Sequence, residues 1–109
     1  MIRKFFGDGD RDFALPAKMI LELERKRSIA FGALLNRVRA GQFYFDDVAE
    51  TIRLALIGGG APPHEAHALV TAYVGTEGNP LIEAQILATE ILLDHYAGKP
   101  AEQVSNEPA

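Results

Sequence analysis

The sequence predicts a mainly α-helical fold: about five short helices in a compact bundle, with a β-hairpin at the N-terminus. Apolar residues recur at helical spacing in five segments, and proline or glycine bounds most of them. Only residues 2–15 suggest short extended strands. With 109 residues, 48% of them hydrophobic, the chain suffices for one domain. We expect residues 1–98 to form a single helical domain and residues 99–109, which are polar and without periodicity, to form a flexible tail.

The first element is the predicted hairpin. Residues 2–15 contain two short extended segments around a turn at Gly7 to Asp10. A two-stranded hairpin needs to pack against helices to be stable, and Phe5 or Phe6 would supply that contact together with Phe13 and Leu15.

Two helices are expected next. Pro16 suits the first position of a helix that runs to about Arg25. Ser28 is a candidate N-cap for a second helix, which Gly41 would close. Because neither glycine nor proline separates the two segments, one bent helix is an alternative. The residues expected to face inward are Ile20 and Leu23 in the first segment and Phe31, Leu34, Leu35 and Val38 in the second.

The third helix should begin at Asp46 or Asp47, either of which offers a capping oxygen. If Asp47 is the cap, Glu50 completes a capping box. The helix should end at Gly58, because successive glycines make a further turn costly. Gly58 or Gly59 is expected to take the left-handed conformation that often ends a helix.

The fourth helix is expected to begin at Pro62 or Pro63, after the short glycine corner. Its inward side would carry Ala66, Leu69, Val70, Tyr73 and Val74.

The last helix should start from Asn79 as N-cap, with Pro80 in the first position, and run to about Ala97. Its acidic residues form a narrow strip, and most of the remaining circumference is apolar. A helix that is apolar on two sides is either central in its fold or covered by a partner. The acidic strip consists of Glu83, Glu90 and Asp94. One apolar side consists of Ala84, Ala88, Ile91 and Leu92, and the second apolar side consists of Ile82, Ile86 and Leu93.

Residues that could perform chemistry are few. The chain has no cysteine, and His64 and His67 are three residues apart, which does not fit the zinc motif HExxH. His95 is the third histidine. The acidic pair at positions 46 and 47 is explained by helix capping. We therefore expect no enzyme activity, no metal site, no cofactor and no small-molecule substrate.

Charge is unevenly distributed along the chain. The net charge is −4; residues 1–53 hold 10 Lys/Arg and 8 Asp/Glu, whereas residues 54–109 hold 1 and 7. Basic residues between Arg25 and Arg39 could form a small positive patch, but acidic neighbours favour the solvated side of two helices. Binding to nucleic acid is not expected. The absence of a membrane-spanning run and of a signal-peptide core favours a cytoplasmic location.

Five segments follow one another along residues 1–98: FALPAKMILELE, ALLNR, DDVAETIRLALIGGG, HEAHALV and PLIEAQILATEIL. With these motifs in this order, the chain resembles the gene transfer agent family of phage tail assembly chaperones. One position departs from the family pattern: Pro62 stands where a serine or threonine usually caps the fourth helix. The most specific element is the structural motif formed by Ile52, Arg53, Leu56, Gly58, Gly59 and Gly60.

The resemblance implies a binding protein that keeps the long tape-measure protein soluble until the tail tube assembles around it. The expected partner is that tape-measure protein or another tail protein. The residues expected to contact it are Ile82, Ile86, Leu93 and Tyr96, although the same residues could instead pack in the core. The alternatives are a small helical DNA-binding or regulatory domain, and a structural head-tail component of the particle.

Overall fold

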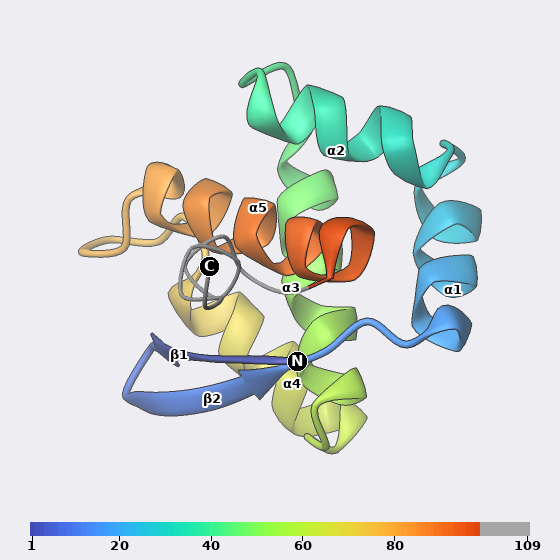
Figure 1. Ribbon diagram of the computed structural model, residues 1–109. Helices are drawn as coiled ribbons and strands as arrows, with labels where there is room; N and C mark the ends of the chain where they lie inside the picture. The colour runs from blue at the N-terminus through green and yellow to red at the C-terminus, as the bar shows by residue number, and fades with distance from the viewer. Residues whose placement is uncertain (99–109) are drawn as a thin grey trace, which may run out of the picture.

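Five helices and an N-terminal hairpin make up the fold, which confirms the predicted fold class (Figure 1). The computed structural model describes residues 1–98, and the predicted tail at 99–109 lies outside them. Two separate helices follow the hairpin, so the alternative of one bent helix is wrong. The elements are β1 (Ile2–Phe6), β2 (Gly9–Phe13), α1 (Ala17–Arg27), α2 (Phe31–Arg39), α3 (Phe45–Gly58), α4 (Pro63–Tyr73) and α5 (Leu81–Ala97).

Helix α3 is the centre of the molecule. It runs through the middle, with α5 crossing in front of it, α2 and α1 above and beside it, and α4 and the hairpin below (Figure 1). All four other helices and β2 contact it. Because it has neighbours on nearly every side, α3 buries residues around most of its circumference: Asp47, Val48, Ala49, Thr51, Ile52, Leu54, Ala55 and Leu56.

The hairpin packs one side against the helices, as expected. Its strands are antiparallel, with Ile2 opposite Phe13 and Phe6 opposite Gly9. Phe6 and Phe13 are buried and meet edge to face, with ring centroids 6.0 Å apart. Tyr73 of α4 packs on the other edge of Phe6. These aromatic contacts fasten the hairpin to the core, and Phe5 points outward.

Two helices, α1 and α5, begin one residue later than predicted, and α4 begins at Pro63, the second of its two predicted starts. Pro16, Pro62 and Pro80 are N-cap residues, with φ between −63° and −60° and extended ψ, rather than the first helical residues. The restricted φ of proline suits this position, and an N-cap residue needs no N–H of its own for the helix. The prediction of Asn79 as a cap is therefore wrong, whereas the loss of a side-chain cap at Pro62 is confirmed.

The junction between α1 and α2 also differs from the prediction. Ser28 ends α1 in the left-handed conformation, with φ 55° and ψ 45°, and it does not cap α2. The carboxylate of Glu24 in α1 instead accepts a hydrogen bond of 2.8 Å from the backbone N–H of Phe31, in the first turn of α2. A side chain from the preceding helix thus satisfies a donor that Ser28 was expected to satisfy.

Candidate functional site

The outer side of α5 presents a row of exposed apolar side chains. Ile82, Ile86 and Tyr96 are exposed by 62%, 55% and 67%, and Leu93 is partly buried against the core. We call these four residues the α5 stripe. The opposite side of the helix is buried and consists of Ala84, Leu87, Ala88, Ile91 and Leu92. The predicted contact residues therefore do lie together along one side of α5, and three of the four are available at the surface.

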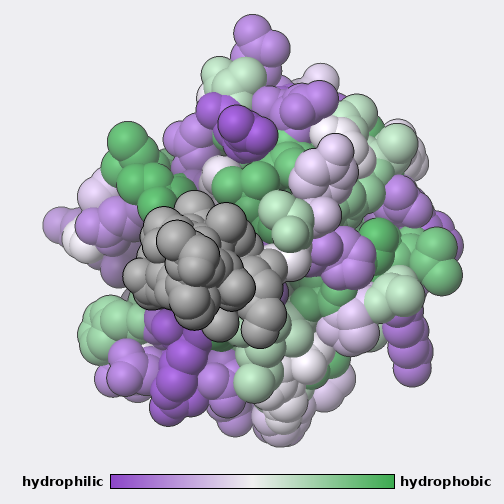
Figure 2. All heavy atoms as spheres, viewed as in Figure 1, coloured by the Kyte–Doolittle hydropathy of each residue, from purple (hydrophilic) through white to green (hydrophobic). Residues whose placement is uncertain are grey.

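Aromatic residues from other helices extend the α5 stripe at both ends. At its C-terminal end, the ring of Tyr96 stacks on Phe31 of α2, with centroids 6.4 Å apart. At its N-terminal end, Phe45 of α3 and Leu81 of α5 both lie close to Gly75. In Figure 2 apolar side chains gather over α5 and beside its first turns. Across the stripe's length of about 21 Å, at 1.5 Å per residue, the apolar surface reaches from α2 to the start of α3.

Two acidic residues beside the α5 stripe bind the hairpin. Glu90 pairs with Lys4 at 3.3 Å, and Asp94 pairs with the N-terminal amino group of Met1 at 2.9 Å. The acidic strip expected from the sequence is therefore only partly solvated, because two of its carboxylates hold β1 against α5. Glu83 is the exposed member of the strip without an ion pair within residues 1–98.

The structural motif lies where the hairpin meets α3. Ile52 and Leu56 are buried in the core, and Arg53 pairs with Glu50 of the preceding turn at 2.7 Å. The chain leaving β2 crosses this end of α3, where the backbone N–H of Ala14 donates to the carbonyl of Ala55 at 3.0 Å. The motif thus joins the hairpin to the central helix, which is a structural role.

The three glycines of the motif serve different purposes. Helix α3 ends at Gly58 as predicted, but Gly58 and Gly59 do not take the left-handed conformation: Gly59 has φ −85°, and the positive φ, +117°, falls at Gly60. A Cβ at Gly58 would overlap the carbonyl oxygen of Ala14, and one at Gly59 would overlap that of Asp12. Glycine is needed at these two positions because another backbone passes directly over them.

The role of Asp47 differs from the capping role that the sequence predicts. It is not the N-cap of α3; Tyr44 is, and the Asp47 carboxylate reaches back to its backbone N–H at 2.8 Å. Asp47 is fully buried and also receives Arg27 of α1 at 2.9 Å and Arg37 of α2 in a two-pronged contact at 2.8 Å. One carboxylate therefore joins three helices.

The surroundings of Asp47 keep its carboxylate ionised. Burial by itself raises the pKa of Asp47, but hydrogen bonds from Arg37, Arg27 and the Tyr44 backbone outweigh this effect and hold the pKa below its ordinary value. The guanidinium of Arg37 lies 5.4 Å from the centroid of the Tyr44 ring as well. The sequence offered only a local sign of this cluster, namely two acidic residues before an apolar helix, and the arginines lie 10 and 20 residues away.

Ion pairs also neutralise most of the basic residues between Arg25 and Arg39, for which the sequence favoured the solvated side of two helices over a positive patch. Arg27 and Arg37 pair with Asp47, and Arg25 and Lys26 pair with Glu22. Arg39 is the member of this group without an ion pair within residues 1–98. Arg27 and Arg37 thus join α1 and α2 to α3, whereas Arg25 and Lys26 pair within α1. With most of their charge paired in this way, these side chains do not form a continuous surface for phosphate groups.

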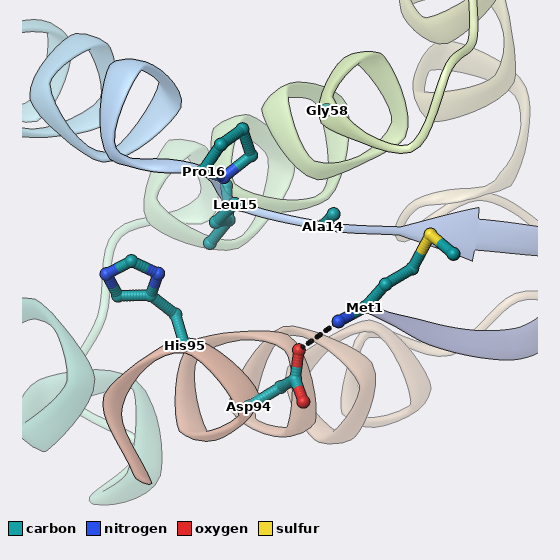
Figure 3. A pocket seen from close by; sticks show the side chains of 7 residues that line it. All are labelled: Met1, Ala14, Leu15, Pro16, Gly58, Asp94 and His95. Atoms are coloured by element: carbon teal, nitrogen blue, oxygen red, sulfur yellow. Dashed lines mark hydrogen bonds and ion pairs between the residues drawn. The ribbon is translucent and has the colours of Figure 1, made fainter. Parts of the chain in front are cut away.

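A hollow of about 380 Å³ opens beside the C-terminal half of α5 (Figure 3). Asp94 and His95 line it from α5, with Ala14, Pro16 and Gly58 on the facing side. Its one carboxylate is already paired with the amino group of Met1, as the dashed line shows. The hollow therefore offers no free acid and base pair for chemistry.

The three histidines do not gather at one site. His64 and His67 are exposed on α4, whereas His95 of α5 packs edge to face on Phe31 at 5.3 Å. Within residues 1–98, His, Asp and Glu side chains form no group of three that could hold a metal ion. In the same part of the chain, none of the helices has the length and apolar character needed to cross a bilayer.

Comparison with known proteins gives one match. The sequence matches the family profile described as "Phage tail tube protein, GTA-gp10" over residues 1–98. Searches of curated proteins and of solved structures returned no match. The matched range covers the hairpin and all five helices, including the structural motif and the α5 stripe. The chain therefore belongs to the GTA-gp10 family of phage tail assembly chaperones, which are not enzymes.

Proposed function

We propose that this protein binds the tape-measure protein during tail assembly, in the cytoplasm of the producing cell, and that the α5 stripe is the contact surface. The observation that carries the proposal is the two-sided character of α5. One side completes the core, and the other leaves Ile82 and Ile86 more than half exposed. Exposed apolar side chains that lie together on one side of a helix are typical of interaction surfaces, whereas single ones scattered over a surface are not.

The geometry suits a helical partner. A tape-measure protein is expected to be long and helical, with apolar stripes that self-associate until the tail tube encloses them. The α5 stripe runs along a straight helix and can pack against one such stripe as helices do, with side chains at i, i+4 and i+7 interdigitating. A single helix pair buries a modest area, so the contact is expected to be reversible. Reversibility is what a chaperone requires, since the tube must later replace it.

The direct test is co-expression with the tape-measure protein of the same tail gene cluster, followed by pull-down and light scattering. We expect a soluble complex, with the partner aggregated when it is expressed alone. The variant Ile82→Gln, Ile86→Gln should lose the complex, because it removes two exposed apolar contacts and keeps helix propensity. Leu21→Gln is the matched control, since Leu21 is 67% exposed on α1. An equally insoluble partner with and without the wild-type protein would overturn the proposed function.

A structural role in the finished particle is the second candidate, because the family description speaks of a tail tube protein. The two roles differ in where the protein is found after assembly. A chaperone is absent from purified particles, whereas a tube component is present at many copies per tail. Quantitative mass spectrometry of purified tails separates them.

A further inference from the structure

The N-terminal end of the α5 stripe is an apolar corner formed by two helices. Phe45, in the first turn of α3, is 49% exposed, and Leu81 and Ile82 in the first turn of α5 are exposed by 36% and 62%. Phe45 and Leu81 both approach Gly75 in the loop before α5. Ile82, the residue after Leu81, is the first member of the α5 stripe, so the two exposed side chains beside Gly75 lie next to the start of the stripe. We call this surface, Phe45, Leu81 and Ile82, the apolar corner.

Each of the chain segments that meet at the apolar corner carries a carboxylate residue close in sequence to it. Asp46 follows Phe45, Glu77 lies in the loop after Gly75, and Glu83 follows Ile82. All three are exposed and have no ion-pair partner within residues 1–98. Glu90 and Asp94, farther along α5, are neutralised by the hairpin. Residues 54–98 contain no lysine or arginine, so α5 and the loop before it carry no cation of their own to offset these carboxylates.

We infer that the occupant of this surface is an amphipathic helix of the tape-measure protein with lysine or arginine at one end, an inference that rests on the proposed function. Its apolar side would lie along the α5 stripe, and its cationic end would lie over the apolar corner, beside Asp46, Glu77 and Glu83. Charge complementarity therefore fixes the direction of the bound helix as well as its composition. A second copy of this chain is the poorer occupant, because it would bring the same carboxylates toward the corner.

The apolar and the charged parts of the surface have separate consequences. The apolar contacts supply most of the affinity, and the carboxylates select between partner helices of equal hydrophobicity. Exposed ion pairs are individually weak and screened by salt. We therefore expect a preference of about tenfold for a cationic over an anionic helix end at low salt, and a smaller one at high salt.

The test uses two designed peptides of about 18 residues, long enough to follow the stripe. Both carry the same leucine stripe; one ends in three lysines and the other in three glutamates, with a photo-crosslinker beside the charged end. Fluorescence anisotropy with the wild-type protein should show the lysine peptide binding more tightly. Its crosslink should fall at the apolar corner, within residues 45–46 or 75–83, and not within residues 93–97 at the other end of α5.

A charge exchange makes the test decisive. The variant Glu77→Lys, Glu83→Lys should reverse the preference toward the glutamate peptide, and a circular dichroism melt of each variant checks that it is folded. Equal binding of both peptides to the wild type, an unchanged preference in the variant, or crosslinks to a second copy at the apolar corner would each overturn the inference. If the wild type keeps the tape-measure protein soluble while the peptides show no preference, only this inference fails. If it does not keep that protein soluble, the proposed function fails.

Discussion

Helices α3 and α5 are both rich in apolar residues, but they use them differently. In α3 the apolar residues from Val48 to Leu56 are buried, because other helices and the hairpin surround it. In α5 the inward side is equally buried, while Ile82 and Ile86 face solvent. The neighbours of a helix, and not its apolar content, therefore decide whether a second apolar stripe becomes core or surface.

The charged residues of the two helices differ in the same way. Asp47 of α3 is buried and holds two other helices through Arg27 and Arg37. Glu90 and Asp94 of α5 make partly exposed ion pairs with the hairpin. Substitutions in α3 should therefore affect folding, and substitutions on the outside of α5 should affect binding.

The largest effect is expected from truncating a buried residue of α3. Ile52→Ala should lower the free energy of unfolding by about 4 kcal/mol, because Ile52 is fully buried and the truncation leaves a cavity. Ile86→Ala, the same change on the outside of α5, should cost less than about 0.5 kcal/mol. Urea denaturation followed by circular dichroism measures both. Similar losses for the two variants would contradict the distinction between the helices.

Removing the carboxylate of Asp47 should have the next largest effect. Asp47→Ala leaves Arg27 and Arg37 without their buried partner and should cost about 3 kcal/mol. Asp47→Asn keeps the shape and an acceptor for the Tyr44 N–H, and should cost less. If the alanine variant were as stable as the wild type, the cluster would contribute nothing to joining α1 and α2 to α3.

The same cluster should make stability depend on pH. The folded-state pKa of Asp47 lies below its ordinary value of 3.8, so the unfolded state binds the proton more readily. The stabilisation that the ionised Asp47 carboxylate provides is therefore complete above about pH 5, roughly one unit above the pKa of the unfolded state. It is lost as the pH falls through the pKa of the folded state. The difference in unfolding free energy between wild type and Asp47→Asn should shrink on acidification below about pH 4. A difference that stays constant from pH 7 to about pH 2 would show that the ionised form is not the stabilising one.

A methyl group at the end of α3 should also destabilise the fold. Gly58→Ala places a Cβ against the Ala14 carbonyl, so the chain leaving β2 must shift, at a cost of about 2 kcal/mol. Gly9→Ala is the control, because a Cβ there meets no atom within 4 Å. Thermal melts of both variants measure the effect. An unaffected Gly58→Ala variant would mean that the hairpin does not depend on its close contact with α3.

Local patterns in the sequence predicted the helices well, because helix formation depends on residues that are close together in the chain. Helical spacing identified many of the buried residues of the five helices, and Gly58 and Gly98 marked helix ends. It did not identify Ala49, Thr51 and Leu54 in α3 or Leu87 in α5. Proline located three helix starts to within one residue. Contacts between distant residues were not predictable in this way. Nothing near Asp47 in sequence indicates that Arg27 and Arg37 converge on it, and a local capping role explained the acidic pair sufficiently.

The candidate site shows the same limit. Periodicity placed Ile82, Ile86 and Leu93 on one side of α5, but it could not say which neighbours cover that side. In the fold, Leu93 is partly covered by the core, whereas Ile82 and Ile86 have no such cover. Likewise, the need for glycine at 58 and 59 comes from the chain that crosses them, not from the turn that follows.

The smallest expected effect on stability is the most informative for function. Ile82→Gln with Ile86→Gln should change the free energy of unfolding by less than about 0.5 kcal/mol, because both side chains are exposed and glutamine favours a helix at least as well. Binding to the tape-measure protein should nevertheless fall sharply, whereas Leu21→Gln on α1 should leave both quantities unchanged. Denaturation and pull-down on the same preparations compare the two effects. A large loss of stability would mean that this side of α5 belongs to the core after all, and unchanged stability with unchanged binding would mean that the partner uses another surface.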